Sequence, residues 1–285
     1  KGEMEVALRA RDDMARFTVA TWNVENLFRP AASASAATQR RYQDKLGLMT
    51  AVIADLDPDV LAQQELGSAG ALADLAQALG GAWPHQTTAN PDGRGIRVGF
   101  LSRLKFQSAP QQIADFPPGP ALAIQGLGAD GLTRPATRMG RAALHVRVRK
   151  AGTYVNLVNA HLKSKLLSFT RPNGVSFTPR DEGERAQVAG IALHRRAAEA
   201  VTLRLYANTL LEGNDRAALL VLGDFNDVPE AQTSLLLTGA SGSEIGTGGF
   251  DRPDAGDDAR LFNLAAMIAP DRRYSRIHAG RGELL

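Results

Sequence analysis

Two apolar strand patterns lie close together near the middle of the chain. The segments Arg141–Lys150 and Thr153–Leu162 are both rich in Val and Leu, and Lys150-Ala151-Gly152 separates them. A connection this short turns the chain back on itself, so the two strands are expected to form an antiparallel hairpin. The pattern therefore argues against a purely parallel, doubly wound sheet.

The rest of the chain alternates strand patterns with helical patterns. Further short apolar segments predict strands at Phe17–Val24, Asp59–Gln64, Gly95–Leu101 and Ala217–Phe225. Ala, Leu, Arg and Glu at helical spacing predict helices at Gln39–Asp55, Ala69–Leu79 and Asp181–Leu211. No internal repeat or long Pro-, Gly- or Ser-rich linker divides the chain. We therefore expect an N-terminal extension over residues 1–15 and a single α/β domain with mixed sheets over residues 16–285.

The composition limits the chemistry of any metal site. None of the 285 residues is cysteine, which removes disulfides, thiolate nucleophiles and thiolate-bound zinc. A metal must then be held by Asp, Glu, His or Asn. No apolar run approaches the roughly 18 residues of a membrane-spanning helix, so we expect no transmembrane segment.

The positive charge of the chain is concentrated in one segment. Between Gly131 and Arg180 there is no Asp or Glu, but there are ten basic residues. They are Arg134, Arg138, Arg141, Arg147, Arg149, Lys150, Lys163, Lys165, Arg171 and Arg180. This segment favours an anionic partner such as nucleic acid, a phospholipid headgroup or a small phosphate ester. The alternative is a solvated strand face that acidic residues from elsewhere in the fold neutralise.

Four of the strand patterns end on polar side chains able to bind a metal or a phosphate. They are Asn23, Glu65, His161 and the pair Asp224 and Asn226. Because side chains alternate faces along a strand, Asp224 and Asn226 are expected to point the same way. Each residue alone has an ordinary structural explanation, but the repetition predicts a shared functional rim.

The same segments resemble a known family. Thr-Trp-Asn-Val-Glu-Asn-Leu at 21–27, Gln64-Glu65, Asn-Ala-His-Leu-Lys-Ser at 159–164 and Gly-Asp-Phe-Asn-Asp-Val-Pro at 223–229 resemble, in order, the signatures of the endonuclease/exonuclease/phosphatase superfamily, which has the DNase I-like fold. The resemblance implies an α/β (α+β type) four-layer sandwich of two packed, mixed, mainly antiparallel sheets flanked by helices. It also implies hydrolysis of phosphoester bonds that depends on Mg²⁺ or Mn²⁺.

The resemblance also implies a role for each polar residue. Glu65 would be the principal metal ligand with Asn23 beside it, which suits an ion that takes one or two carboxylates and keeps several waters. Asp224 would orient or deprotonate the attacking water, and Asn226 would donate a hydrogen bond to a phosphate oxygen. His161 would stabilise the developing charge or protonate the leaving oxygen.

Three basic residues are candidate substrate contacts. Lys163 follows His161 by two positions and is expected on the same strand face, near a phosphate. Arg103 resembles a family position near the site, with an ordinary surface residue as the alternative, and Arg138 comes from the acid-free segment. Asp227 is expected to be a turn residue and not a third ligand.

The favoured function is a metal-dependent phosphodiesterase or nuclease that acts on DNA or RNA. One alternative is an inositol-phosphate or phospholipid phosphoesterase of the same superfamily, similar to sphingomyelinases. Another is a non-catalytic nucleic-acid-binding module. The segment Leu166–Arg180, expected to be a loop with interleaved aromatic and basic residues, suits bases or lipid equally well.

The C-terminus departs from the family pattern. Members continue past a segment like Gly280–Leu285 into an Asp-His pair and a final Ser-Asp-His, which supply a second histidine and another carboxylate. We therefore expect the sequence in hand to stop short of the last strands of the domain.

Overall fold

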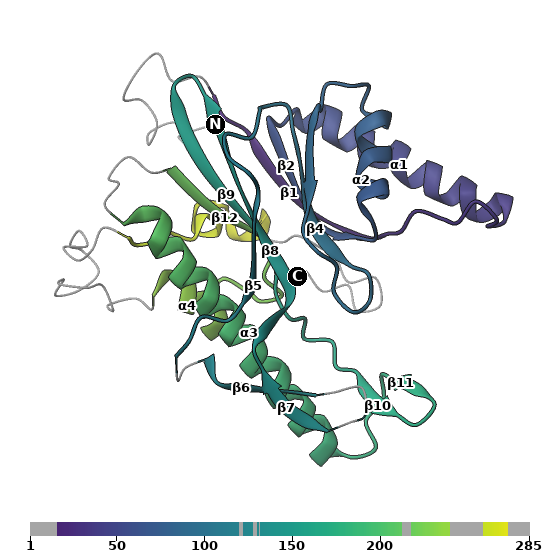
Figure 1. The fold of residues 1–285 in the computed structure, drawn as a ribbon, viewed down its shortest axis with the longest axis vertical. Coiled ribbons are helices and arrows are strands. Elements are labelled where there is room, and N and C mark those ends of the chain that lie inside the picture. Colours follow the sequence, from purple (N-terminus) through teal and green to yellow (C-terminus); the bar gives the residue numbers. More distant parts are fainter. Residues whose placement is uncertain are drawn as a thin grey trace. The chain divides into compact units, whose positions relative to one another are not determined.

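The computed structural model describes residues 16–119, 122–127, 130, 132–212, 218–239 and 259–272, so the predicted N-terminal extension and the segment 280–285 lie outside the described residues. The strands are β1 (Val19–Leu27), β2 (Val60–Leu66), β3 (His85–Thr88), β4 (Arg97–Ser102), β5 (Gln111–Asp115), β6 (Ile124–Leu127), β7 (Thr133–Ala136), β8 (Arg138–Lys150), β9 (Thr153–His161), β10 (Phe169–Arg171), β11 (Gly174–Ser176) and β12 (Ala218–Asp224) (Figure 1). The helices are α1 (Ala36–Leu56), α2 (Ala69–Ala78), α3 (Glu182–Leu211), α4 (Gln232–Thr238) and short 3-10 turns at Leu264–Met267 and Pro270–Arg272.

The described strands form two four-stranded sheets and two small ribbons. One sheet has the order β1-β2-β4-β3, in which β1 and β2 are parallel and the other pairs are antiparallel. The other sheet has the order β12-β9-β8-β5, and the ribbons are β6-β7 and β10-β11. Lys150 of β8 pairs with Thr153 of β9 in an antiparallel register, which confirms the hairpin predicted from the sequence. The predicted fold class is also confirmed, because two mainly antiparallel sheets are flanked by helices.

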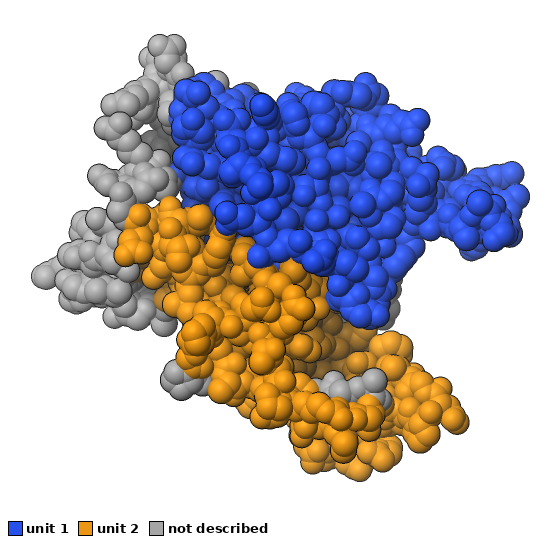
Figure 2. All heavy atoms as spheres, in the orientation of Figure 1, with its two compact units in different colours: residues 1–112, 143–160, 217–223 blue, residues 113–142, 161–216, 224–285 orange. Residues whose placement is uncertain are grey.

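The chain divides into two compact units (Figure 2). Unit 1 contains Lys1–Gln112, Ala143–Ala160 and Ala217–Gly223, and unit 2 contains Ile113–Ala142, His161–Arg216 and Asp224–Leu285. Unit 1 therefore holds the β1-β2-β4-β3 sheet with α1 and α2, whereas unit 2 holds α3, α4 and the segments that follow β9 and β12. The single domain expected over residues 16–285 stays a prediction.

Helices α1 and α2 begin and end where their capping residues require. Ser35 accepts a hydrogen bond from the Thr38 N–H at 3.2 Å, and Ser68 caps α2 in the same way. Asp57 ends α1 in the left-handed region, with φ of 42°, directly before a proline that cannot continue a helix. Both helices bury apolar side chains against β1, β2 and β4; the cluster includes Val24, Leu27, Tyr42, Leu46, Met49, Ile53, Leu61, Leu66, Leu72, Leu75 and Leu101.

Within unit 1, a buried asparagine joins the two sheets. The amide of Asn159 on β9 donates to the backbone oxygens of Gln63 at 3.0 Å and Gly99 at 2.9 Å, and its oxygen accepts from Gln64 at 2.7 Å. Strand β9 therefore packs against β2 and β4, as the predicted sandwich requires. Asn159 is thus a buried structural link between the sheets.

The sequence patterns missed several short elements. Strand β3 begins at His85 and strand β5 ends at Asp115, and no sequence pattern predicted either strand. The segment expected as a loop at Leu166–Arg180 contains the β10-β11 hairpin, in which Phe169 pairs with Ser176. Strands of three to five residues carry too few alternations to stand out in a sequence. In the described part of the chain, no helix is long and apolar enough to cross a membrane.

Gly223 allows β12 to approach β9 more closely than any other residue would. Its φ is 133°, and a Cβ atom at this position would lie 1.9 Å from the carbonyl oxygen of Ala160. We expect Gly223→Ala to lower the free energy of unfolding by about 2–5 kcal/mol, through backbone strain and overpacking combined. Urea unfolding followed by circular dichroism measures this.

Gly47 provides the matched control for this substitution. It lies in the interior of α1, and a Cβ atom there would meet nothing within 4 Å. Because alanine is the better helix former, Gly47→Ala is expected to raise stability by up to about 1 kcal/mol. Equal stability of Gly223→Ala and the wild type would contradict the close approach of β12 to β9.

Candidate active site

Asn23 and Glu65 form a hydrogen-bonded pair in unit 1. They lie on the parallel strands β1 and β2, where the amide nitrogen of Asn23 donates to Oε1 of Glu65 at 3.2 Å. The pairing of β1 with β2 shifts register just after Asn23, and Glu65 has a φ of 64°. Both residues were expected at the ends of their strands, but β1 continues to Leu27 and β2 to Leu66, with a bulge between them. A non-glycine residue in the left-handed region costs about 1–3 kcal/mol, and such residues concentrate at functional sites.

The environment of Glu65 includes a lysine that the sequence did not indicate. Lys45 of α1 donates to the backbone oxygen of Glu25 at 2.7 Å. Burial lowers the pKa of Lys45, whereas the charges of Glu25 and Glu65 raise it. Lys45 belongs to no motif, and only the packing of α1 beside β1 and β2 brings it near the Glu65 carboxylate.

The donor set at Glu65 fits a hard divalent ion. No group of three or more His, Asp or Glu side chains in the described residues is placed to hold a metal. Mg²⁺ commonly uses only one or two protein carboxylates and completes its shell with water and substrate phosphate. The amide of Asn23 donates to Glu65 and its oxygen accepts from the Glu25 N–H at 2.9 Å, so Asn23 orients the carboxylate. An oriented carboxylate of this kind suits such an ion.

His161, Asp224 and Asn226 meet in unit 2. His161 is the last residue of β9 and Asp224 the last residue of β12, and His161 Nε2 lies 3.6 Å from Asp224 Oδ2. The backbone oxygen of Asp224 accepts from the Leu162 N–H at 3.0 Å, and the Asn226 amide donates to the Leu162 oxygen at 3.0 Å. A carboxylate beside a buried imidazole can accept a proton while the imidazole donates one.

Asn226 reaches this group by a turn and not by strand alternation. Strand β12 ends at Asp224, and Asn226 has a φ of 53°. Its N–H donates to Oδ1 of Asp224 at 2.9 Å, a local bond that Asp commonly makes to the backbone two residues on. Asp224 and Asn226 are therefore close together as expected, but a turn brings them together and not the alternation of side chains along a strand. The side-chain amide of Asn226 has a second N–H, which can donate to a substrate oxygen.

Lys163 does not lie on the strand face where it was expected. Strand β9 ends two residues earlier, and the Lys163 ammonium group donates to the backbone oxygens of Ser164 at 2.9 Å and Leu166 at 3.2 Å. Burial lowers the pKa of Lys163, and the charge of Arg141 lowers it further. A phosphate contact by Lys163 stays a prediction.

Arg103 and Glu65 lie at opposite ends of β2. Ser102 pairs with Val60, the first residue of β2, and Arg103 forms an ion pair with Asp57 at 2.6 Å and stacks on Trp83. Glu65 lies five positions after Val60 in β2, which is about 17 Å at the usual rise. Arg103, which was expected near the site, therefore does not lie near Glu65, because β4 runs antiparallel to β2.

Much of the basic segment is neutralised by carboxylates from outside it. Six of its ten basic residues form ion pairs: Arg134 with Asp130, Arg138 with Asp115, Lys150 with Asp59, Lys165 with Asp227, and Arg171 and Arg180 with Glu184. Arg138, a predicted substrate contact, lies 2.9 Å from Asp115 in this way. The ion pairs of these six residues fit the alternative interpretation of the charge segment.

Two charged residues of α3 contact the segment after β9 and have no motif around them. Glu199 accepts from the Lys163 N–H at 2.6 Å, and Arg196 donates to the Lys163 oxygen at 3.0 Å. Arg196 also lies 3.3 Å from Asp227. Asp227 thus pairs with basic side chains, in keeping with its expected role as a turn residue.

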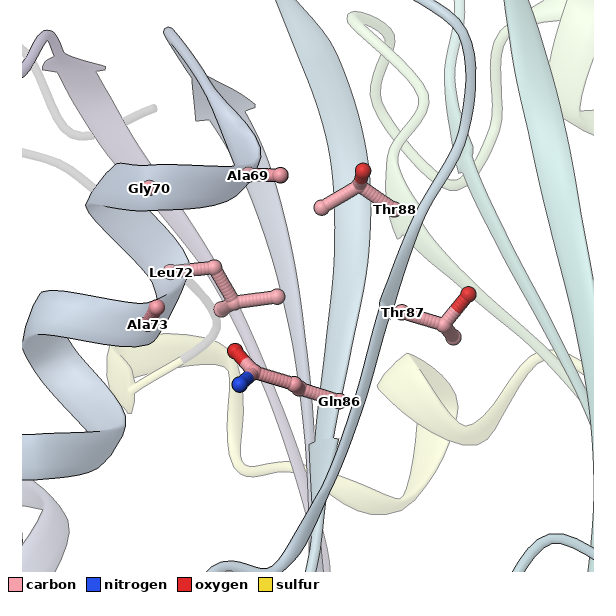
Figure 3. Close-up of a pocket in the computed structure, with 7 residues that line it drawn as sticks. All are labelled: Ala69, Gly70, Leu72, Ala73, Gln86, Thr87 and Thr88. Carbon is pink, nitrogen blue, oxygen red and sulfur yellow. The ribbon is translucent and has the colours of Figure 1, made fainter.

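A cavity of about 360 Å³ lies between α2 and β3 in unit 1 (Figure 3). Its lining residues are Ala69, Gly70, Leu72, Ala73, Gln86, Thr87 and Thr88. The lining has no carboxylate or imidazole for a metal and no cationic side chain for a phosphate, and it contains none of the predicted site residues.

Comparison with known proteins identifies the family of the chain. The sequence model of the Endonuclease/Exonuclease/phosphatase family matches residues 20–278. The chain belongs to this family. The residues that the resemblance singled out, Asn23, Glu65, His161, Asp224 and Asn226, lie in the two groups described above, and their roles stay predictions. No curated protein sequence matches the chain.

One solved structure shares the fold, and two others are less similar. A beta-hairpin deletion mutant of beta toxin from Staphylococcus aureus has a TM-score of 0.50 at 15% identity, over 78% of this chain and 73% of that chain. TDP2 from C. elegans has a TM-score of 0.46 at 17% identity, over 75% of this chain and 49% of that chain. The human Nocturnin catalytic domain has a TM-score of 0.46 at 16% identity, over 76% of this chain and 67% of that chain. At 15% identity the likeness to the beta toxin structure concerns the fold alone.

Proposed function

We propose that this member of the family is a divalent-metal-dependent phosphodiesterase that cleaves DNA or RNA by attack of water on phosphorus. The observation that carries the proposal is the group of His161, Asp224 and Asn226, with 3.6 Å between the imidazole and the carboxylate. A proton acceptor, a proton donor and an amide donor in one cluster supply what hydrolysis of a phosphodiester needs.

Each residue has one task in the proposed reaction. Asp224 orients the water and takes its proton as the new bond from oxygen to phosphorus forms. His161 gives a proton to the leaving oxygen as the old bond breaks, and Asn226 donates to a non-bridging oxygen. Glu65, oriented by Asn23, would hold a Mg²⁺ or Mn²⁺ ion, which when bound neutralises charge on the phosphate.

A stacked group on the β8-β9 hairpin in unit 1 supports nucleic acid as the substrate. The guanidinium groups of Arg147 and Arg149 lie 4.2 Å and 5.2 Å from the ring centre of Tyr154. Within the described residues, neither arginine has a carboxylate within ion-pair distance. Arginines that stack on an aromatic ring and keep their charge suit the phosphates and bases of a single strand.

Exposed apolar side chains favour a phospholipid as the second candidate substrate. On and beside the β10-β11 hairpin, Leu166, Val175 and Phe177 are 64%, 65% and 66% exposed. An apolar hairpin tip suits contact with a lipid surface as well as stacking on bases.

The two candidates are separated by a substrate panel tested on the full chain. We expect cleavage of single-stranded DNA or RNA and of a generic aryl phosphodiester with Mg²⁺ or Mn²⁺, and complete loss with excess chelator. Activity that survives the chelator would contradict the metal dependence. Turnover of sphingomyelin vesicles or inositol phosphates, with oligonucleotides untouched, would replace the nuclease proposal with the second candidate. Salt-dependent binding of oligonucleotides with no turnover of any substrate would instead indicate a non-catalytic nucleic-acid-binding module.

A further inference from the structure

Helix α3 carries two buried charged side chains within one turn. The side chains of Arg196 and Glu199 are only 6% and 1% exposed, and their spacing of three residues puts them on the same face of the helix. Burying a charge costs several kcal/mol unless hydrogen bonds and opposite charges compensate it. The groups that these two side chains bind therefore indicate why they are buried.

Both side chains bind the main chain of one residue, Lys163. Glu199 accepts from its N–H at 2.6 Å, and Arg196 donates to its carbonyl oxygen at 3.0 Å. Lys163 follows the end of β9, where no sheet partner fixes the backbone. The two side chains thus hold the N–H and the carbonyl of a residue just beyond the strand.

Further contacts of the two side chains reach other elements of unit 2, and Arg195 Nε on the same helix lies 3.9 Å from Glu199 Oε1. The second carboxylate oxygen of Glu199 accepts from the Gly140 N–H of β8 at 2.7 Å, and Arg196 Nε lies 3.3 Å from Asp227 Oδ2. Burial raises the pKa of Asp227, but hydrogen bonds from Lys165 and Thr233 and the charges of Lys165 and Arg196 outweigh burial and hold the pKa below its usual value. Asp227 is therefore a firm anionic partner for Arg196.

The geometry around His161 follows from these contacts. Leu162, the next residue, donates its N–H to the Asp224 oxygen at 3.0 Å and accepts from the Asn226 amide at 3.0 Å. The main chain of Leu162 is thus held by the turn after β12, and that of Lys163 by α3. Because Arg196 also holds Asp227, one helix fixes both segments that carry the proposed catalytic residues.

We propose that Arg196 and Glu199 are positioning residues that keep His161 in register with Asp224 and Asn226. The proposal rests on the proposed function for its catalytic part. Neither side chain is placed to touch the reacting atoms, and both act through the main chain of Lys163 and through Asp227.

Substitutions of nearly unchanged size test the proposal. In Glu199→Gln one oxygen becomes an NH₂ group, which faces the N–H of either Gly140 or Lys163 and cannot accept from it. Arg196→Lys keeps the charge but cannot bind Lys163 and Asp227 with a planar fork. We expect each to lower kcat on an aryl phosphodiester about 10- to 100-fold while KM changes less than about threefold, because misplacement by 1 Å costs this much. The kcat of Arg196→Ala is expected to be lower than that of Arg196→Lys.

Arg204→Ala is the matched control on the same helix. Arg204 donates to the carbonyl oxygens of Leu237 at 3.2 Å and Ala259 at 2.6 Å, away from the Lys163 segment. We expect this variant to lose thermal stability like the others and yet keep its kcat, when all are assayed well below their Tm. Equal loss of kcat in Arg204→Ala, or normal kcat in Glu199→Gln and Arg196→Ala, would overturn the positioning role.

Amide hydrogen exchange, followed by NMR, gives a readout that does not depend on activity. We expect Glu199→Gln to speed exchange at residues 161–165 at least tenfold and leave β2 and β4 unchanged. Unchanged exchange at residues 161–165 would overturn the positioning role of Glu199. If the wild type cleaves no phosphodiester, the proposed function fails, and the exchange experiment still decides whether Glu199 holds the backbone of this segment.

Discussion

Asp224→Asn is expected to lower kcat for a phosphodiester about 10²- to 10⁴-fold, the range that loss of a general base or acid produces. Asn has nearly the same size and keeps an oxygen that can accept from the Asn226 N–H, which Asp224 binds at 2.9 Å. It cannot take a proton from water, and it removes the negative charge 3.6 Å from His161. Because binding of substrate does not need this proton transfer, KM is expected to change little. Steady-state kinetics on an aryl phosphodiester measures both constants.

Asp130→Asn is the control for this substitution. Asp130 is an acidic residue of unit 2 that pairs with Arg134, and hydrogen bonds from Arg134 lower its pKa to about 2. Loss of its charge is expected to leave kcat unchanged. The double variant Asp224→Asn, His161→Gln is expected to lose much less than the product of the two single effects, because both residues act in one step. Full activity of Asp224→Asn, or strictly multiplicative losses, would contradict the assignment.

Glu65→Gln is expected to lower kcat/KM at least about 10²-fold and to raise the Mg²⁺ or Mn²⁺ concentration needed for half-maximal activity. Substitution of a residue that only supports a metal ligand commonly lowers metal affinity or activity 10- to 100-fold, so substitution of the ligand itself should lower them more. Gln keeps the size of the side chain but provides a neutral oxygen in place of the carboxylate. Titration of Mn²⁺ followed by electron paramagnetic resonance measures metal binding without turnover.

Asn23→Ala separates the ligand from the residue that orients it. The Asn23 amide donates to Glu65 at 3.2 Å, so its loss should weaken metal binding about 10- to 100-fold and leave the carboxylate in place. Glu182→Gln is the control, because its side chain is 82% exposed at the start of α3 and pairs only with Arg185 among the contacts described. Wild-type metal affinity in Glu65→Gln would exclude Glu65 as a ligand, whatever happens to turnover.

The sequence predicted the local structure well where local physics decides it. The hairpin at Lys150-Ala151-Gly152 follows from a turn too short for any other connection. The end of α1 at Asp57 follows from the proline after it, which cannot continue a helix. The short strands β10 and β11 were missed, because three residues give no usable periodicity.

The candidate site was predictable in its members but not in its geometry. The motif residues Glu65, His161, Asp224 and Asn226 were named from the sequence, and the structure pairs them within their units. Asn226 was expected on a strand face, whereas a left-handed turn with φ of 53° carries it. Arg103 was expected near the site, but the antiparallel register of β4 puts it at the far end of β2 from Glu65.

The sequence by itself determined which residues can perform the chemistry and which segments form helices and strands, since both depend on residue type and on near neighbours. Only the tertiary structure decided which charges are neutralised and which are buried. Carboxylates such as Asp59 and Glu184 lie outside the acid-free segment that they neutralise, and Glu199 meets the Lys163 N–H across 36 positions of sequence. Hydrogen bonds and ion pairs depend on distance in space, and no local pattern records the packing that brings such distant groups together.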